Sequence, residues 1–101
     1  MHPRARDAIR EFSKPARRDI GEQLFKLQLG VNIGLPDARP MAEIRQGVYE
    51  LRVRDNAGTY RVFYYLKSEK GILVFRAFTK KTQRTPQSEI ELGKRRLTEM
   101  L

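Results

Sequence analysis

Apolar residues in the N-terminal third of the chain recur with the period of an α-helix. The first set lies within residues 4–12 and comprises Ala5, Ala8, Ile9 and Phe12. The second set follows Ser13, which is a favourable N-cap, and comprises Ala16, Ile20, Leu24 and Leu27, until Gly30 ends the pattern. The spacing therefore predicts two amphipathic helices that form a helical hairpin.

The middle of the chain changes from helical to strand periodicity. Residues 31–40 show no period and contain a glycine and two prolines, which predicts a loop. Beyond about residue 43 apolar and polar residues alternate, and turn-forming residues interrupt the alternation twice. Strands are expected over residues 49–54, 59–66 and 72–79. Short turns between consecutive strands predict an antiparallel meander.

A final helix is expected at the C-terminal end. Thr85 can act as its N-cap and Pro86 can occupy its first position. Its apolar stripe comprises Ile90, Gly93, Leu97 and Leu101, and its other face carries Lys94, Arg95 and Arg96. The predicted fold class is α+β, with an N-terminal helical hairpin packed on a small antiparallel sheet and a closing C-terminal helix, in one domain of residues 1–101.

Strand alternation divides the side chains of the sheet between two faces. The face under the helices is expected to hold Tyr49, Leu51, Val53, Tyr60, Val62, Tyr64, Leu73, Phe75 and Ala77. The opposite face collects Arg52, Arg54, Arg61, Phe63, Tyr65, Arg76 and Phe78. Arginines bind phosphates and exposed aromatic rings stack on bases, so this mixture suits single-stranded RNA. We expect Tyr65 to stack on a base and Tyr64 to lie in the core.

Composition points to a polyanionic partner. The chain has 101 residues, with 21 Lys and Arg against 12 Asp and Glu, a formal charge of +9 and a pI near 10.4. Such a field suits nucleic acid, although an acidic protein would satisfy it too. The absence of cysteine excludes disulfides and thiolate metal sites, and no apolar run approaches a membrane span. We expect a cytoplasmic protein that needs no metal or other cofactor and does not bind membranes.

The basic residues differ in how easily a solvated position would explain them. Arg61 and Arg76 lie within apolar runs, where an arginine usually meets a carboxylate or a phosphate, and acidic residues in the neighbouring strands are scarce apart from Glu50. Arg52 and Arg54 could equally form a solvated sheet face. The cluster of Lys80, Lys81 and Arg84 could equally be a solvated loop.

The available side chains limit the possible phosphodiester chemistry. Carboxylates are scattered, which disfavours a two-metal site, and the single histidine, His2, is at a terminus that we expect to fray. RNA cleavage by its own 2′-hydroxyl remains, with cations that orient the phosphate and stabilise developing charge. A lysine among other cations loses part of its preference for the charged form, so Lys80 or Lys81 could act as base or acid.

Several ordered motifs carry a resemblance to a known family. Gln28-Leu29-Gly30 closes a helix, Gly47 to Arg52 and Tyr60 to Tyr64 follow as strands, and Phe78 to Pro86 combines a strand end with basic residues. Together they resemble the phage-derived HigB-like branch of the RelE/ParE toxin superfamily. Two departures stand out: the tyrosine of the RelE pattern is replaced by Thr85-Pro86, and the usual first strand before the helices is missing. Either translation starts further upstream or an edge of the sheet is open, and an open edge could accept an antitoxin segment.

The resemblance implies a type II toxin that cleaves mRNA on the ribosome. It implies catalytic roles for Arg61, Lys80 and Lys81, and we expect RNA-binding roles for Arg52, Arg54, Tyr65, Arg76 and Arg84. Implied partners are the ribosome, mRNA and an antitoxin, often a helix-turn-helix protein, with operator DNA bound only through that antitoxin. Two alternatives stay open: a ParE-like inhibitor of DNA gyrase, and an inert basic RNA-binding module.

Overall fold

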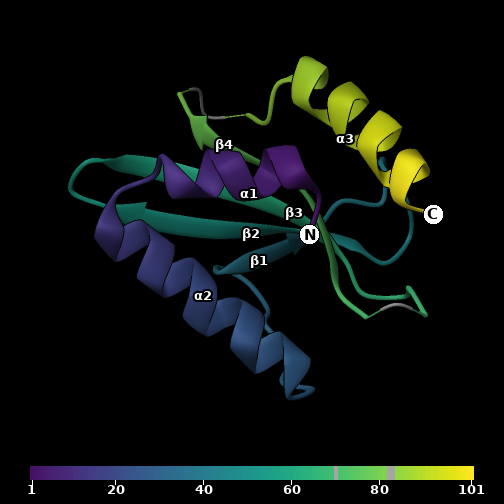
Figure 1. Ribbon diagram of the computed structural model, residues 1–101, viewed down its shortest axis with the longest axis horizontal. Coiled ribbons are helices and arrows are strands. Elements are labelled where there is room, and N and C mark those ends of the chain that lie inside the picture. Colours follow the sequence, from purple (N-terminus) through teal and green to yellow (C-terminus); the bar gives the residue numbers. More distant parts are fainter. Residues whose placement is uncertain (70, 82–83) are drawn as a thin grey trace.

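The computed structural model describes residues 1–69, 71–81 and 84–101, and in these ranges it contains three helices and one four-stranded sheet (Figure 1). The elements are α1 (Pro3–Arg10), α2 (Lys14–Gln28), β1 (Ala38–Pro40), β2 (Val48–Asp55), β3 (Gly58–Tyr65), β4 (Leu73–Lys80) and α3 (Gln87–Met100). The predicted α+β class, with an N-terminal helical hairpin, a meander and a C-terminal helix, is confirmed.

Both ends of α2 follow from local sequence. The Ser13 hydroxyl accepts a hydrogen bond from the Ala16 N–H at 3.2 Å, which satisfies one of the free donors in the first turn. At the other end Gly30 has a φ of +84°, and the Val31 N–H donates to the Lys26 carbonyl at 3.0 Å. This is a Schellman motif, for which glycine is best suited.

The sheet is fully antiparallel, with the order β1-β2-β3-β4. Asp55 closes the β2–β3 hairpin, because its Oδ1 accepts hydrogen bonds from the Ala57 and Gly58 N–H groups at 2.8 and 3.0 Å. The prediction that residues 31–40 form only a loop is wrong for the last three residues of this range. Ala38 pairs with Leu51 and Pro40 with Tyr49, so a three-residue strand adds to the β2 edge. Pro40 is tolerated there because β1 is an edge strand.

The sheet separates two apolar cores. Beneath α1 and α2 lies a core to which the sheet contributes Leu51, Val53, Tyr60, Val62, Tyr64, Val74 and Ala77. The core under α3 includes Val48, Phe63, Tyr65, Leu73, Phe75 and Phe78 from the sheet, with Ile90 and Leu97 from the helix. Tyr64 is in the core as predicted, and burial, followed by the effect of Tyr49, raises its pKa to about 12.

A β-bulge overturns the predicted faces of Leu73 and Phe75. Phe63 pairs with Arg76, but the next residue, Tyr64, pairs with Val74, so Phe75 is the extra residue of β4. The bulge places Leu73 and Phe75 under α3 and puts Val74 into the other core. One extra residue is enough to exchange faces because side chains in a strand alternate with a period of two.

Helix α3 packs closely on the sheet, since a Cβ on Gly93 would lie 3.1 Å from the Phe63 ring. Ile90, Gly93 and Leu97 are buried as predicted, whereas Leu101 is exposed. Arg96 was expected on the outer face and is instead buried, with Nη1 3.5 Å from the Phe75 carbonyl.

The N-terminus is tied to the rest of the fold, contrary to the expectation that His2 frays. The His2 N–H donates to the Val74 carbonyl of β4 at 2.7 Å, and its ring Nδ1 accepts from the Arg4 N–H at 3.1 Å. Its Nε2 lies 3.4 Å from a Glu99 carboxylate oxygen of α3. The N-terminal segment therefore lies beside β4 and the C-terminal part of α3. No helix in the described ranges is long and apolar enough to cross a membrane.

Candidate nucleic-acid site

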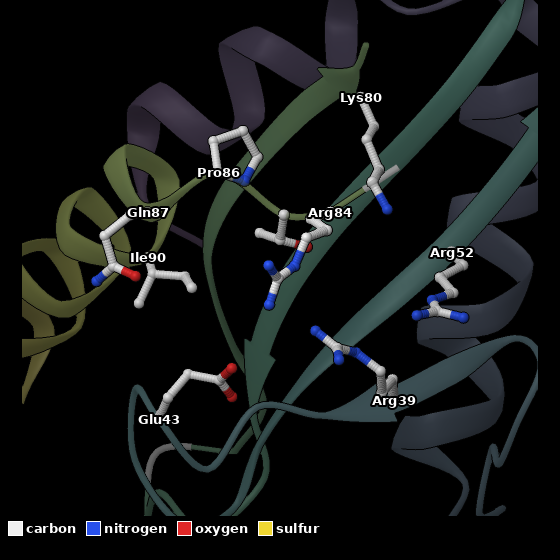
Figure 2. A pocket seen from close by; sticks show the side chains of 9 residues that line it. Arg39, Glu43, Arg52, Lys80, Arg84, Pro86, Gln87 and Ile90 are labelled. Carbon is white, nitrogen blue, oxygen red and sulfur yellow. The ribbon is translucent and has the colours of Figure 1, made fainter. Parts of the chain in front are cut away.

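The sheet face that carries α3 is only partly covered by that helix, and the uncovered part forms a basic cavity. The cavity has a volume of about 660 Å³ and is lined by Arg39, Glu43, Arg52, Lys80, Arg84, Thr85, Pro86, Gln87 and Ile90. Four of these residues are cationic and one is acidic. Figure 2 shows the charged ends of Arg39, Lys80 and Arg84 turned toward a common space, with Arg52 beside them.

Antiparallel pairing brings these cations together from distant parts of the sequence. Arg39 of β1 lies opposite Glu50 of β2, and Arg52 of β2 lies opposite Arg61 of β3. Lys80 of β4 pairs with Thr59, so it is a diagonal neighbour of Arg61 on the same face. The register of three strand pairs thus determines the composition of the site.

A buried carboxylate lies beneath the cavity. Glu50 has no exposed surface, and its Oε1 is 3.4 Å from the Nε atoms of both Arg52 and Arg61 and 3.9 Å from that of Arg39. Of these three groups, only Arg52 donates a hydrogen bond to it; the buried Nε atoms of Arg39 and Arg61 have no hydrogen-bond partner within the described residues. One carboxylate therefore lies among three guanidinium groups. Because it can neutralise only one positive charge, the cluster keeps a net positive charge.

The second oxygen of Glu50 fixes the segment that leads into α3. Thr85 donates its hydroxyl hydrogen to Oε2 at 2.5 Å. The predicted role of Thr85 as a helix N-cap is therefore wrong: Pro86 occupies the N-cap position, α3 begins at Gln87, and no side chain caps the helix. Because Thr85 binds Glu50, the start of α3 is held at the wall of the cavity.

The surroundings of Lys80 reduce its basicity. Burial is the largest cause that lowers the pKa of Lys80, and the nearby cation of Arg61 lowers it further, while Glu50 opposes both. This is the direction expected for a lysine held among arginines. A lower pKa increases the neutral fraction of the amine near physiological pH, as proton transfer requires.

Arg61 and Arg54 line a second, adjoining cavity. It has a volume of about 430 Å³, and Arg52 lines both cavities. The side chain of Arg61 is only 9% exposed, and its Nη1 donates to the Tyr60 carbonyl at 3.1 Å. Burial lowers the pKa of Arg61 and Glu50 counters this, but a guanidinium remains charged at physiological pH.

Arg76 does not join this cluster. Its Nε and Nη2 form two hydrogen bonds to the Glu89 carboxylate of α3, at 2.6 and 2.9 Å, and its guanidinium lies 5.3 Å from the centre of the Phe78 ring. The expectation that Arg76 lacks an acidic partner is therefore wrong. The partner lies 13 residues away, in a helix rather than in a neighbouring strand.

The aromatic residues predicted to share the basic surface are covered by α3. Phe63, Tyr65 and Phe78 are at most 7% exposed, and all three pack in the core under the helix. Arg45 donates to the Tyr65 hydroxyl at 3.3 Å and its guanidinium lies 5.6 Å from the ring centre. Tyr65 therefore presents no free ring face to a base, which corrects the stacking prediction.

The sequence-predicted residues are thus divided among several places. Arg52, Lys80 and Arg84 line the first cavity, Arg54 and Arg61 line the second, and Lys81 is exposed beyond the end of β4. Among described residues no group of three or more His, Cys, Asp or Glu side chains is arranged to hold a metal ion.

Sequence reasoning missed two residues of the site, because Arg39 was assigned to a loop and Thr85 to a helix cap. Glu50 was named as the one acidic residue near the strand arginines, and its ion pairs with Arg52 and Arg61 confirm this. The one available signal was Glu50, a carboxylate within an apolar strand, where an acidic residue needs cations around it. Nothing in the local sequence connects Arg39 or Thr85 to this carboxylate.

Comparison with known proteins gives one family. The family model described as Phage derived protein Gp49-like (DUF891) matches residues 7–98, so the chain belongs to the Gp49-like family. This family is linked to RelE-type toxins. No curated protein and no solved structure shows a significant match.

Proposed function

We propose that this Gp49-like protein is the toxin of a type II toxin–antitoxin system and that it cleaves mRNA. The link between the family and RelE-type toxins supports the toxin role. The motifs that resemble the HigB-like branch favour an endoribonuclease that acts on translated messages. The observation that carries the proposal is the cavity in which Arg39, Arg52, Lys80 and Arg84 converge above Glu50.

The charge and size of the cavity suit one phosphodiester of a single-stranded RNA. A volume of about 660 Å³ accommodates a nucleotide, and guanidinium groups contact two phosphate oxygens at once. Because Glu50 neutralises only one of the neighbouring arginines, the cluster gains electrostatic free energy when it binds an anion. The buried carboxylate also holds the arginines in place before the ligand arrives, so less ordering is needed on binding.

The proposed reaction is intramolecular attack by the RNA. The 2′-oxygen of the ribose forms a bond to the adjacent phosphorus, and the bond from phosphorus to the 5′-oxygen of the next nucleotide breaks. Lys80, in its neutral form, takes the proton of the 2′-hydroxyl, and solvent protonates the departing 5′-oxygen. The products are a 2′,3′-cyclic phosphate and a 5′-hydroxyl, and no electrons are exchanged with a further reactant.

Arginines of the site stabilise the charge that develops on the phosphate. Arg52 and Arg84 line the cavity and would contact the non-bridging oxygens in the transition state. Arg61 acts from beside the cavity, through its field and through the lowered pKa of Lys80. Lys81 lies outside the lining and would contribute to long-range attraction of the RNA rather than to proton transfer.

The proposed partners follow from this activity. The ribosome presents the message, and a cognate antitoxin, of the helix-turn-helix type found with related toxins, neutralises the protein in the cytoplasm. Binding to operator DNA would occur only through that antitoxin. The formal charge of +9 favours both ribosomal RNA and an acidic antitoxin segment.

The test is induction of the chain without an antitoxin, followed by mapping of mRNA 5′ ends. Growth arrest with new cuts inside translated frames is expected, and Lys80→Ala should remove the cuts. Lys81→Ala is the matched control, since it removes the same charge one residue away and should retain most of the activity. Arrest with intact messages and a loss of DNA supercoiling would replace the proposal with gyrase inhibition. The absence of arrest, with RNA binding retained, would instead indicate an inert module.

A further inference from the structure

The second cavity has a different chemical character from the first. It is lined by Asp19, Pro36, Asp37, Arg52, Val53, Arg54, Thr59 and Arg61. Three arginines come from β2 and β3, whereas the two aspartates come from α2 and from the loop that precedes β1. The cavity therefore combines cationic residues of the sheet with anionic residues from α2 and the loop, and Pro36 adds apolar surface.

The two carboxylates are available to a ligand. Within the part of the chain that the structure describes, neither Asp19 nor Asp37 has a side-chain hydrogen bond or an ion pair within 4.0 Å. They line the same cavity as the arginines but form no ion pair with them. Each carboxylate can accept two hydrogen bonds in one plane.

Arg61 provides an independent indication of a ligand. Its side chain is 91% buried and lines the cavity; Nε lies against the Glu50 carboxylate, Nη1 donates to the Tyr60 carbonyl, and among the described residues nothing accepts a hydrogen bond from Nη2. A largely buried guanidinium with a donor left over at the wall of a cavity favours an acceptor supplied from outside. The cavity thus needs a ligand with acceptors on one side and N–H donors on the other.

A phosphate group alone does not meet this requirement, because the aspartates would repel it. Guanine does: its Watson–Crick edge offers two adjacent donors, N1–H and N2–H, which match a carboxylate, and its O6 and N7 atoms accept from arginine. Adenine and cytosine lack the paired donors. One flat face of the base would pack on Pro36.

We propose that the second cavity binds a guanine base next to the scissile phosphate, with Asp19 and Asp37 selecting it and Arg54 and Arg61 contacting its acceptors. Arg52, which lines both cavities, would contact the phosphate that joins the two nucleotides. This inference rests on the proposed function for its ligand class, RNA, but not on cleavage.

The test measures binding rather than cleavage. Short fluorescent RNAs carrying 2′-O-methyl groups, which cannot be cleaved, are compared by anisotropy with G, A, C, U or inosine at one position. The wild-type protein should bind the G oligonucleotide about tenfold more tightly than the A oligonucleotide. Inosine, which lacks the N2 amino group, should bind with intermediate affinity.

The decisive variant is Asp19→Asn, Asp37→Asn, which should abolish the preference for guanine and keep affinity for the A oligonucleotide. Its matched control is Glu11→Gln, Glu22→Gln, which removes two exposed carboxylates outside the cavity and should keep the preference. Equal binding of all bases, or a preference that survives in the aspartate variant, would overturn the inference. Preference for guanine without any cleavage of messages on translating ribosomes would refute the proposed catalytic function and leave the base site standing.

Discussion

Two ends of one sheet face contain arginines in opposite situations. At the end covered by α3, Arg76 is matched with one carboxylate, Glu89, through two hydrogen bonds. At the open end three arginines share Glu50, and Lys80 and Arg84 add further positive charge. The covered end is electrically balanced and packed against aromatic rings, whereas the open end retains a net positive charge beside a cavity.

The difference shows that an arginine within an apolar strand is not by itself a functional signal. What matters is the ratio of carboxylates to cations around it, because a one-to-one pair stabilises the fold and an excess of cations leaves attraction for an anion. The balanced end should therefore govern stability with little effect on activity. At the open end, the cavity cations should govern activity, and the buried carboxylate should hold them together.

Replacement of Glu50 is expected to have the largest effect. Glu50→Gln would leave three clustered guanidinium groups without a neutralising charge, at a cost of about 3–5 kcal/mol in the free energy of unfolding. For a domain of this size the melting temperature should fall by more than about 10 °C. Thermal denaturation of the variant measures this. A fall no greater than that of Glu89→Gln would contradict the central role assigned to Glu50.

Removal of a cavity cation should impair the chemistry and spare the fold. Arg52→Ala or Lys80→Ala is expected to reduce the rate of RNA cleavage about 100-fold or more, because each loses transition-state stabilisation or proton transfer. The melting temperature of Lys80→Ala should be equal to or above that of the wild-type protein, since mutual repulsion among cations is relieved. Arg52→Ala also loses a hydrogen bond to the buried Glu50 carboxylate and should melt at a lower temperature than Lys80→Ala. Cleavage at the wild-type rate by Lys80→Ala would exclude it from catalysis.

The balanced pair should behave in the opposite way. Arg76→Ala leaves the partly buried Glu89 carboxylate unpaired and is expected to cost about 1–3 kcal/mol of stability. Because Arg76 lies outside both cavities, the cleavage rate at a temperature where the variant is folded should be within about twofold of wild type. Unfolding by urea and cleavage assays on the same preparation would separate the two effects. A large loss of cleavage activity in the folded variant would contradict the distinction between the covered end and the open end of the sheet face.

The pH dependence of cleavage is a smaller effect that bears on Lys80. Its pKa is lowered from the ordinary value of 10.5, so the neutral amine accumulates at a lower pH than in a solvated lysine. As a base it acts only when neutral, so the rate should rise as pH increases above neutrality and should level off at a lower pH than an ordinary lysine would give. Lys80→Arg, which keeps the charge and cannot lose its proton, should be slow and should lack this rise.

Much of the fold could be predicted from periodicity, and the departures have local causes. Ser13, Gly30 and the Asp55–Gly58 turn act through contacts a few residues apart, so their roles can be recognised in sequence. The bulge at Phe75 cannot, because it depends on how β4 pairs with β3. Strand β1 is too short for a period to be visible.

The site was harder to predict because its composition depends on distant contacts. The predicted cations Arg52, Lys80 and Arg84 do line one cavity. Tyr65 was misassigned because alternation identifies the face of a residue but not which helix covers that face. In sequence Arg76 resembled Arg61, because both lie within apolar strands. The structure distinguishes them, because Arg76 pairs with Glu89 of α3.

The most direct test of the account is the chemistry of RNA ends produced by the purified protein on translating ribosomes, with Lys80→Ala and Arg76→Ala in parallel. The account predicts 5′-hydroxyl and 2′,3′-cyclic phosphate ends that are lost with Lys80→Ala and retained with Arg76→Ala. Intact messages, fragments with 5′-phosphate ends, or cleavage that persists in Lys80→Ala would contradict it.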